Sequence, residues 1–210
     1  MNELRRLGVF GGAFDPPHRA HVALVRSALD HFHLDEVRVV PTGQAWHKSR
    51  VLTEARHRAA MTRLAFEGID GVRVDERELH RDRPSYTIDT LEELQAEHPA
   101  ARLYLLIGED QCRSLPSWHR IMDVARLAII CAAERDPSVG AWNARQHAEQ
   151  LPATFWAQVE QIPMAPLPIS ATAVREHLAS RKSIAALVPA AVERYIHEHL
   201  LYGLAPRKPH

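Results

Sequence analysis

The chain has 210 residues, of which 46% are hydrophobic and 25% charged, so its composition fits one globular domain and excludes a largely disordered chain. The 26 basic and 26 acidic residues cancel, which disfavours a protein that grips long nucleic acid by neutralising many phosphates. Two cysteines make no disulfide framework, and the longest apolar run, 127–133, is far shorter than the ~20 residues of a membrane span, so we expect a cytoplasmic protein that binds neither nucleic acid nor membrane.

Short apolar runs alternate with helical patterns along most of the chain. The runs predict strands over 7–10, 37–40, 72–74, 103–107 and 128–131. Helical spacing predicts helices over about 18–31, from 53 or 56 onward, from 88 through 94, and over about 172–180 and 190–201. Strands that are apolar on both faces and alternate with helices indicate a parallel sheet that is covered on both sides.

The predicted fold class is therefore α/β, a Rossmann-like doubly wound parallel sheet with a small C-terminal helical part. We expect a single domain over 1–210, with an α/β core over about 1–168 and the helical part over about 169–210. Residues 136–168 carry several prolines and no clear period, so we expect an irregular crossing between the two.

The strongest chemical signal follows the first predicted strand, where residues 11–21 read GGAFDPPHRAH. Their spacing fits neither the G-x-G-x-x-G dinucleotide motif nor the G-x-x-x-x-G-K-[ST] phosphate loop. Gly11 and Gly12 let a ligand approach the backbone, and the two prolines fit a helix start. His18 and His21 would share one face at the positive end of that helix. This arrangement predicts a phosphate site, because no third ligand completes a zinc site.

A second candidate anion site lies at residues 169–175, which read ISATAVR. Ser170 or Thr172 could simply cap a helix. The free N–H groups of that helix start, together with Arg175 one turn later, could also bind an anion.

Both segments resemble signatures of the nucleotidyltransferases related to class I aminoacyl-tRNA synthetases. Residues 11–21 resemble G-G-x-F-D-P-x-H-x-G-H, with Ala20 in place of the usual glycine, and residues 169–175 resemble I-S-S-T-x-[IV]-R. The ATP-binding residues that this resemblance implies are Gly11, Gly12, Phe14, His18, His21, Ile169, Ser170, Thr172 and Arg175. Among these, the catalytic residues are expected to be His18, His21 and Arg175. The methyl group of Ala20 is expected to crowd the nucleotide base without abolishing function.

Between these signatures the chain resembles the bacterial nicotinate-nucleotide adenylyltransferases, in residues 84–91 (PSYTIDTL), 107–110 (IGED) and 115–118 (LPSW). The mononucleotide-binding residues that this resemblance implies are His47, Lys48, Tyr86, Thr87, Asp110, Trp118 and Arg135. The indole of Trp118 suits stacking on an electron-poor pyridinium ring. The match around Arg135 is loose.

The implied reaction transfers AMP from ATP to nicotinate mononucleotide, giving nicotinate adenine dinucleotide and pyrophosphate, a step of NAD biosynthesis. The attacking phosphate is already largely ionised at neutral pH, so no general base is needed. Mg²⁺ is the expected cofactor, bound through the ATP phosphates, and no residue of the chain is assigned as a metal ligand. The expected partners are these two small molecules, and the helical part could also form a homo-oligomer.

Three alternatives stay open at this point. Nicotinamide mononucleotide could replace nicotinate mononucleotide, because an amide can use some of the same hydrogen-bonding groups as a carboxylate. The chain could be a nucleotide sensor that binds ATP without turnover. A stand-alone enzyme that forms aminoacyl adenylates is disfavoured by the absence of a K-M-S-K-S string.

Overall fold

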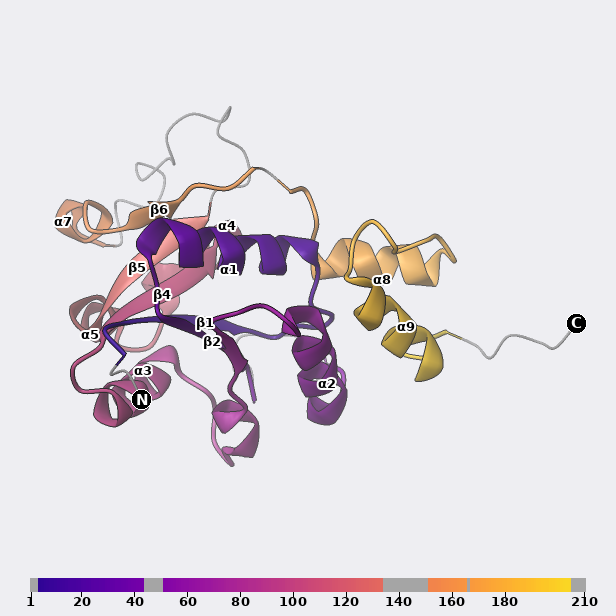
Figure 1. The fold of residues 1–210 in the computed structure, drawn as a ribbon, viewed down its shortest axis with the longest axis horizontal. Helices are drawn as coiled ribbons and strands as arrows, with labels where there is room; N and C mark the ends of the chain where they lie inside the picture. The colour runs from indigo at the N-terminus through magenta and orange to yellow at the C-terminus, as the bar shows by residue number, and fades with distance from the viewer. Residues whose placement is uncertain (1–3, 44–50, 134–150, 166, 205–210) are drawn as a thin grey trace, which may run out of the picture.

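The computed structural model describes residues 4–43, 51–133, 151–165 and 167–204. Its strands are β1 (Arg6–Gly12), β2 (Glu36–Pro41), β3 (Val72–Val74), β4 (Arg102–Gly108), β5 (Ala128–Ala133) and β6 (Glu160–Ile162). They form one sheet in the order β3-β2-β1-β4-β5-β6, and every pairing is parallel (Figure 1). The chain builds outward from β1 to β3 and then returns to place β4 on the other side of β1. The strand order therefore reverses between β1 and β4, where sheets of this kind bind ligands.

The helices that surround the sheet are α1 (Arg19–Phe32), α2 (Ala55–Phe66), α3 (Thr87–Glu97), α4 (Glu109–Ser114), α5 (Ile121–Leu127), α7 (Ala153–Trp156), α8 (Ala171–Ala179) and α9 (Ala190–Glu198), with short 3₁₀ turns η1 (Arg77–His80) and η2 (Leu115–Ser117). Helix α9 packs against α2, beyond the end of the sheet (Figure 1).

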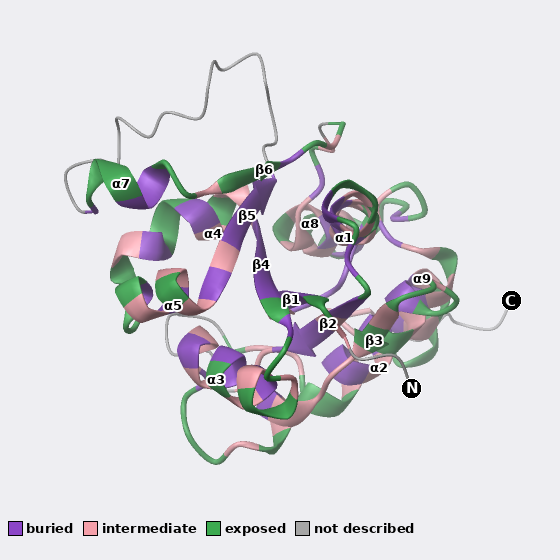
Figure 2. Cartoon of the chain, turned by 60° about the vertical axis from the view of Figure 1, so that its left-hand side comes forward, coloured by how far each residue is buried: buried purple, intermediate pink, exposed green. Residues whose placement is uncertain are grey.

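Two hydrophobic cores lie on opposite faces of the sheet. Because side chains alternate along a strand, Val9 and Leu105 enter the core shared with α3, α4 and α5, whereas Phe10 and Leu106 enter the core shared with α1, α2, α8 and α9. Figure 2 shows these buried strands between partly buried helices. Each such fully buried side chain contributes about 1.5–3 kcal/mol of hydrophobic free energy.

The five predicted strands and the doubly wound α/β class are confirmed, with shifted boundaries. The expectation of an irregular crossing over 136–168 is wrong in part, because α7 and β6 form within it. Strand β6 lies at the sheet edge and exposes Glu160 and Gln161, so it carries no apolar run to detect. Helix α1 begins at Arg19, so both prolines precede it rather than starting it, and α9 ends at Glu198, three residues before the predicted end.

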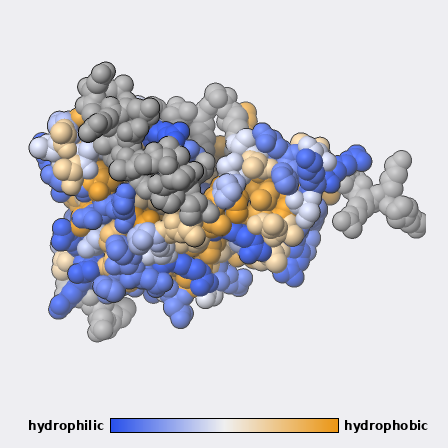
Figure 3. All heavy atoms as spheres, turned by 90° about the horizontal axis from the view of Figure 1, so that it is seen from above, coloured by the Kyte–Doolittle hydropathy of each residue, from blue (hydrophilic) through white to orange (hydrophobic). Residues whose placement is uncertain are grey.

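The exterior of the described part of the chain is mixed in character. Figure 3 shows one face, on which hydrophobic side chains form an interrupted band between hydrophilic ones. Within the described ranges, no helix combines the length and apolarity that crossing a membrane requires.

Candidate active site

A cavity of about 590 Å³ opens where the carboxyl ends of β1 and β4 meet the start of α8. Its wall combines the loop after β1, the first turn of α4 and the segment that leads into α8. The volume falls in the range of cavities that bind small molecules. Residues 11–15 and 169–172, which are far apart in the sequence, thus line one space.

The two signature histidines lie against each other in this wall. The rings of His18 and His21 are stacked, with centroids 3.6 Å apart and planes inclined by 18°. The backbone N–H of His18, the N-cap residue of α1, donates to Nδ1 of His21 at 3.1 Å. An accepting Nδ1 places the proton of a neutral His21 ring on Nε2, which makes that nitrogen a hydrogen-bond donor.

Phe14 supports the histidine pair from the protein side. Its ring meets His21 edge-to-face at 5.2 Å and Phe10 at 5.4 Å, and only 2% of the residue is exposed. Its backbone φ of 46° lies in the left-handed region. A side chain at Gly12 would approach the Phe14 ring to 3.0 Å, so this close packing depends on glycine there.

Ser170 stands at the start of α8, where it could cap the helix, bind an anion or do both. Its Oγ accepts a hydrogen bond from the backbone N–H of Ala173 at 3.1 Å, so Ser170 caps the helix. The hydroxyl can still donate its own proton toward the cavity. Arg175 donates to the carbonyl of Asp15 at 2.7 Å and to Oγ1 of Thr172 at 3.0 Å. The bond to Asp15 joins the two signature segments directly.

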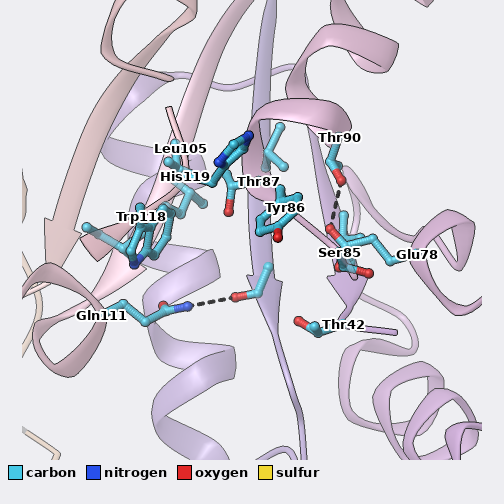
Figure 4. A pocket seen from close by; sticks show the side chains of 15 residues that line it. Thr42, Glu78, Ser85, Tyr86, Thr87, Thr90, Leu105, Gln111, Trp118 and His119 are labelled. Carbon is cyan, nitrogen blue, oxygen red and sulfur yellow. Dashed lines mark hydrogen bonds between the residues drawn. The ribbon is translucent and has the colours of Figure 1, made fainter. Parts of the chain in front are cut away.

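A smaller cavity of about 70 Å³ (Figure 4) shares lining residues with the larger one. Tyr86 and Thr87 line it from the start of α3, and Trp118 and His119 line it from the segment after η2. The Trp118 indole N–H donates to Oγ of Ser114 at 3.0 Å, which orients its ring. The rings of Tyr86, Trp118 and His119 therefore form part of its wall, which suits stacking on a flat heterocycle.

Gln111 connects the two cavities and was not predicted from the sequence. Its Nε2 donates to the carbonyl of Gly11 at 3.2 Å (Figure 4), and its Oε1 accepts the backbone N–H of Gly108 at 3.3 Å. These bonds hold the ends of β1 and β4 together. Gly11, Thr42 and Gln111 line both cavities, so ligands in the two spaces would meet there.

Glu78 is a buried carboxyl in the wall of the smaller cavity and was also not predicted. The Thr90 hydroxyl donates to its Oε1 at 2.7 Å, and Ser85 lies beside it (Figure 4). Burial raises the pKa of Glu78, although the Thr90 hydroxyl, the Arg81 charge and the Ser85 hydroxyl act in the opposite direction.

Arg58 on α2 is a third residue that sequence reasoning missed. It is 3% exposed, and its guanidinium donates hydrogen bonds to four backbone carbonyls. The acceptors are Thr53 at 2.9 Å, Ala13 at 3.0 Å, Thr42 at 2.7 Å and Gly43 at 3.5 Å. A single arginine therefore joins the loop after β1 to the loop after β2. An arginine in a helix with many charges carried no signal of burial.

The structure gathers most of the predicted site residues around the two cavities. The larger cavity is lined by Gly11, Gly12, Phe14, His18, His21, Ile169, Ser170, Thr172 and Arg175, and also by Ala20 and Asp110. Asp110 was predicted to contact the mononucleotide, and it is Gln111 instead that reaches the smaller cavity. His47, Lys48 and Arg135 lie outside the described residues. In the parts of the chain described, no three His, Cys, Asp or Glu side chains group to hold a metal ion.

Comparison with known proteins agrees with this geometry. Residues 9–177 match the model of the cytidylyltransferase-like family. The chain is 50% identical over 202 residues to a probable nicotinate-nucleotide adenylyltransferase of Albidiferax ferrireducens, covering 96% of this chain and 100% of that protein. It is 41% identical over 203 residues to a protein of the same description from Methylibium petroleiphilum, covering 95% and 93%.

Solved structures share the fold at lower identity. Plasmodium falciparum nicotinic acid mononucleotide adenylyltransferase, complexed with APC, aligns with a TM-score of 0.76 and 20% identity, over 96% of this chain and 98% of that one. The same enzyme complexed with NaAD aligns with a TM-score of 0.74 and 22% identity.

Proposed function

The chain belongs to the family of nicotinate-nucleotide adenylyltransferases, within the cytidylyltransferase-like proteins, and from this membership we propose the reaction that it catalyses. It transfers AMP from ATP to nicotinate mononucleotide, and it produces nicotinate adenine dinucleotide and pyrophosphate for NAD biosynthesis. The observation that carries the proposal is the meeting of both signature segments around one cavity, where Arg175 of the second segment donates to the carbonyl of Asp15 in the first.

In this reaction an oxygen of the mononucleotide 5′-phosphate attacks the α-phosphorus of ATP. The bond from that phosphorus to the bridging oxygen breaks, and pyrophosphate leaves with the electron pair. Because the nucleophile is already an anion, catalysis consists of holding two anions in line and stabilising the charge that moves onto pyrophosphate. This chain offers hydrogen-bond donors and a cation for that task rather than a base.

Each signature residue has a proposed role. Nε2–H of His21, with the adjoining His18 ring, donates to oxygens around the α-phosphorus. Arg175 and the hydroxyl of Ser170 hold the β- and γ-phosphates at the start of α8, where the helix dipole favours anions. The backbone at Gly11 lies between ATP and the mononucleotide.

The smaller cavity is the proposed site of the pyridine ring. Trp118 stacks on the ring, while Tyr86, Thr87 and Asp110 contact the remainder of the mononucleotide. His47, Lys48 and Arg135 are proposed to add positive charge toward its phosphate, as the family resemblance implies. Ala20 narrows the larger cavity by one methyl group relative to the usual glycine.

Mg²⁺ is the proposed cofactor and is carried in by ATP. Asp110 and Glu109 line the larger cavity, and their carboxylates fit a hydrated Mg²⁺ through its water molecules rather than as a closed ligand set. Bound to the phosphates, the ion would neutralise charge on the departing pyrophosphate.

We further propose that 1–210 is one cytoplasmic domain, with a core over about 1–168 and a helical part over about 169–210 that could support a homo-oligomer. Helix α8 supports a single domain, because its first residues line the larger cavity while Val174 and Leu178 enter the core formed by the sheet and α1.

The test is pyrophosphate release from Mg·ATP with nicotinate mononucleotide, nicotinamide mononucleotide and phosphopantetheine in parallel. We expect turnover with the first substrate, with kcat/KM at least about 100-fold above the second, because the two differ in charge at the ring substituent. Release with phosphopantetheine instead would move the chain to another nucleotidyltransferase activity. Tight binding of ATP without release of pyrophosphate would identify a sensor.

A further inference from the structure

Asp15 is the signature residue to which the proposed mechanism gives no task. Only 1% of it is exposed, yet it lines the larger cavity. Its Oδ1 accepts a hydrogen bond from the hydroxyl of Tyr202 at 2.8 Å, and its Oδ2 accepts the backbone N–H of Thr53 at 3.2 Å. Its own carbonyl accepts from Arg175 at 2.7 Å. Three segments of the chain therefore meet on one residue.

We propose that Tyr202 is a positioning residue of the ATP site, whose hydroxyl holds the Asp15 carboxylate away from the bound phosphates. The inference rests on the proposed function, because it assigns the larger cavity to ATP. Tyr202 is 187 positions from Asp15 in the sequence and does not line the cavity itself. Its link to the cavity is the carboxylate, although the hydroxyl also lies 3.9 Å from Sδ of Met61.

The Asp15 carboxylate in this wall would repel bound phosphates, and the Tyr202 hydroxyl reduces that repulsion by fixing where the carboxylate oxygen points. ATP brings several negative charges into the cavity, and a buried carboxylate that turned toward them would repel them with little screening by water. A hydrogen bond from a neutral O–H to a carboxylate is stronger than one between neutral groups, and it fixes the direction of the oxygen.

The hydroxyl is well suited to act as a permanent donor. Burial and the Asp15 carboxylate raise the pKa of Tyr202 above its usual value, so the O–H keeps its proton at neutral pH. The remaining oxygen of Asp15 faces the backbone of Thr53, whose carbonyl is in turn held by Arg58 at 2.9 Å. The support of Asp15 is therefore rigid on both sides.

The experiment compares Tyr202→Phe with Tyr195→Phe. Tyr195 is a suitable control, because its hydroxyl also bonds to a side chain far away in the sequence, Nδ1 of His57 at 2.9 Å, and it lines neither cavity. We expect Tyr202→Phe to raise KM for ATP about tenfold and to change KM for nicotinate mononucleotide less than about twofold. Tyr195→Phe should leave both constants unchanged. Equal ATP constants in the two variants would overturn the inference.

A second comparison separates charge repulsion from a general loss of packing. Replacing Asp15 by Asn in the Tyr202→Phe protein removes the charge and should lower KM for ATP again, whereas a packing defect would not be rescued. If Tyr202→Phe alone fails to fold, D15N is compared with D15N/Y202F. In that neutral background we expect the loss of the hydroxyl to change KM for ATP less than about twofold, and a larger change would overturn the inference.

Calorimetry of the wild-type protein with Mg·ATP, together with its pyrophosphate release, distinguishes the two levels of failure. Absence of both signals would remove the proposed function itself. An active wild-type enzyme whose two tyrosine variants behave alike would remove only the role of Tyr202.

Discussion

The imidazole ring of His18 lies flat on that of His21, 3.6 Å between centroids, while the His18 backbone N–H holds Nδ1 of its partner at 3.1 Å. One residue thus fixes both the position and the tautomer of the other. The pair acts as a unit in the wall of the larger cavity.

Substitution of His18 by Ala should lower kcat by about 10²–10³, because a donor to the charge that develops in the transition state is lost. The protein should stay folded, since Phe14 and Phe10 still pack beneath His21. Steady-state kinetics with circular dichroism make the measurement. His31→Ala, at the exposed end of α1, is the control and should keep its activity. A fall of less than about threefold for His18→Ala would remove His18 from catalysis.

Substitution of Trp118 by Ala should raise KM for the mononucleotide about tenfold and leave KM for ATP nearly unchanged, since the indole lines only the smaller cavity. For Trp118→Phe, KM for the mononucleotide should lie between the values of the wild type and of Trp118→Ala, because phenylalanine keeps a smaller ring. Initial-rate measurements with each substrate varied in turn decide this. Equal losses for both substrates would argue against ring stacking.

Substitution of Gly11 by Ala should impair binding without unfolding the protein. A Cβ there would meet no heavy atom of the described residues within 4 Å, so it would project into the shared space of the two cavities. We expect KM for ATP to rise about fivefold. Gly8→Ala is the contrast, because its Cβ would lie 2.8 Å from Cγ2 of Val37 and should destabilise the fold by about 1–3 kcal/mol. Urea unfolding and kinetics of both variants must show this opposite pattern.

Substitution of Arg58 by Met should reduce the free energy of unfolding by about 3 kcal/mol, because four backbone carbonyls lose their charged donor. Arg63→Met on the same helix is the control. The Arg63 side chain is 55% exposed and pairs with the partly exposed Glu76, so its loss should cost less than about 1 kcal/mol. Similar urea midpoints for both variants would contradict a structural role for Arg58.

Glu78 should make the protein less stable as the pH rises. Burial raises its pKa in the folded state, so between the unfolded and the folded pKa the native protein binds more protons than the unfolded chain. The stability that this protonation contributes is complete below the unfolded pKa and is lost as the pH passes the folded one. Relative to wild type, Glu78→Gln should therefore gain free energy of unfolding as the pH rises above the ordinary pKa of a glutamate. Urea titrations at several pH values give the difference, and a constant difference would show that the pKa is not raised.

The sequence alone determined the class of fold and the chemistry of the larger cavity. Apolar runs such as 103–107 are local and periodic, so they mark strands and helices wherever the chain places them. Residues 11–21 and 169–175 carry their chemistry in fixed local spacings, which a reader of the sequence can match directly. The polar edge strand β6 was not predicted, because its pairing with β5, and not its own residue pattern, makes it a strand.

Only the tertiary structure decided which distant polar side chains make hydrogen bonds to the residues that line the site. Arg58, Gln111 and Tyr202 each make a hydrogen bond to the end of β1 or to the loop after it, from positions 45, 100 and 187 residues away. No local pattern distinguishes these side chains from solvated ones, because their burial and their partners arise when distant segments pack together. Which groups form a hydrogen bond depends on their positions in three dimensions, and the spacing of residues along the chain does not give those positions.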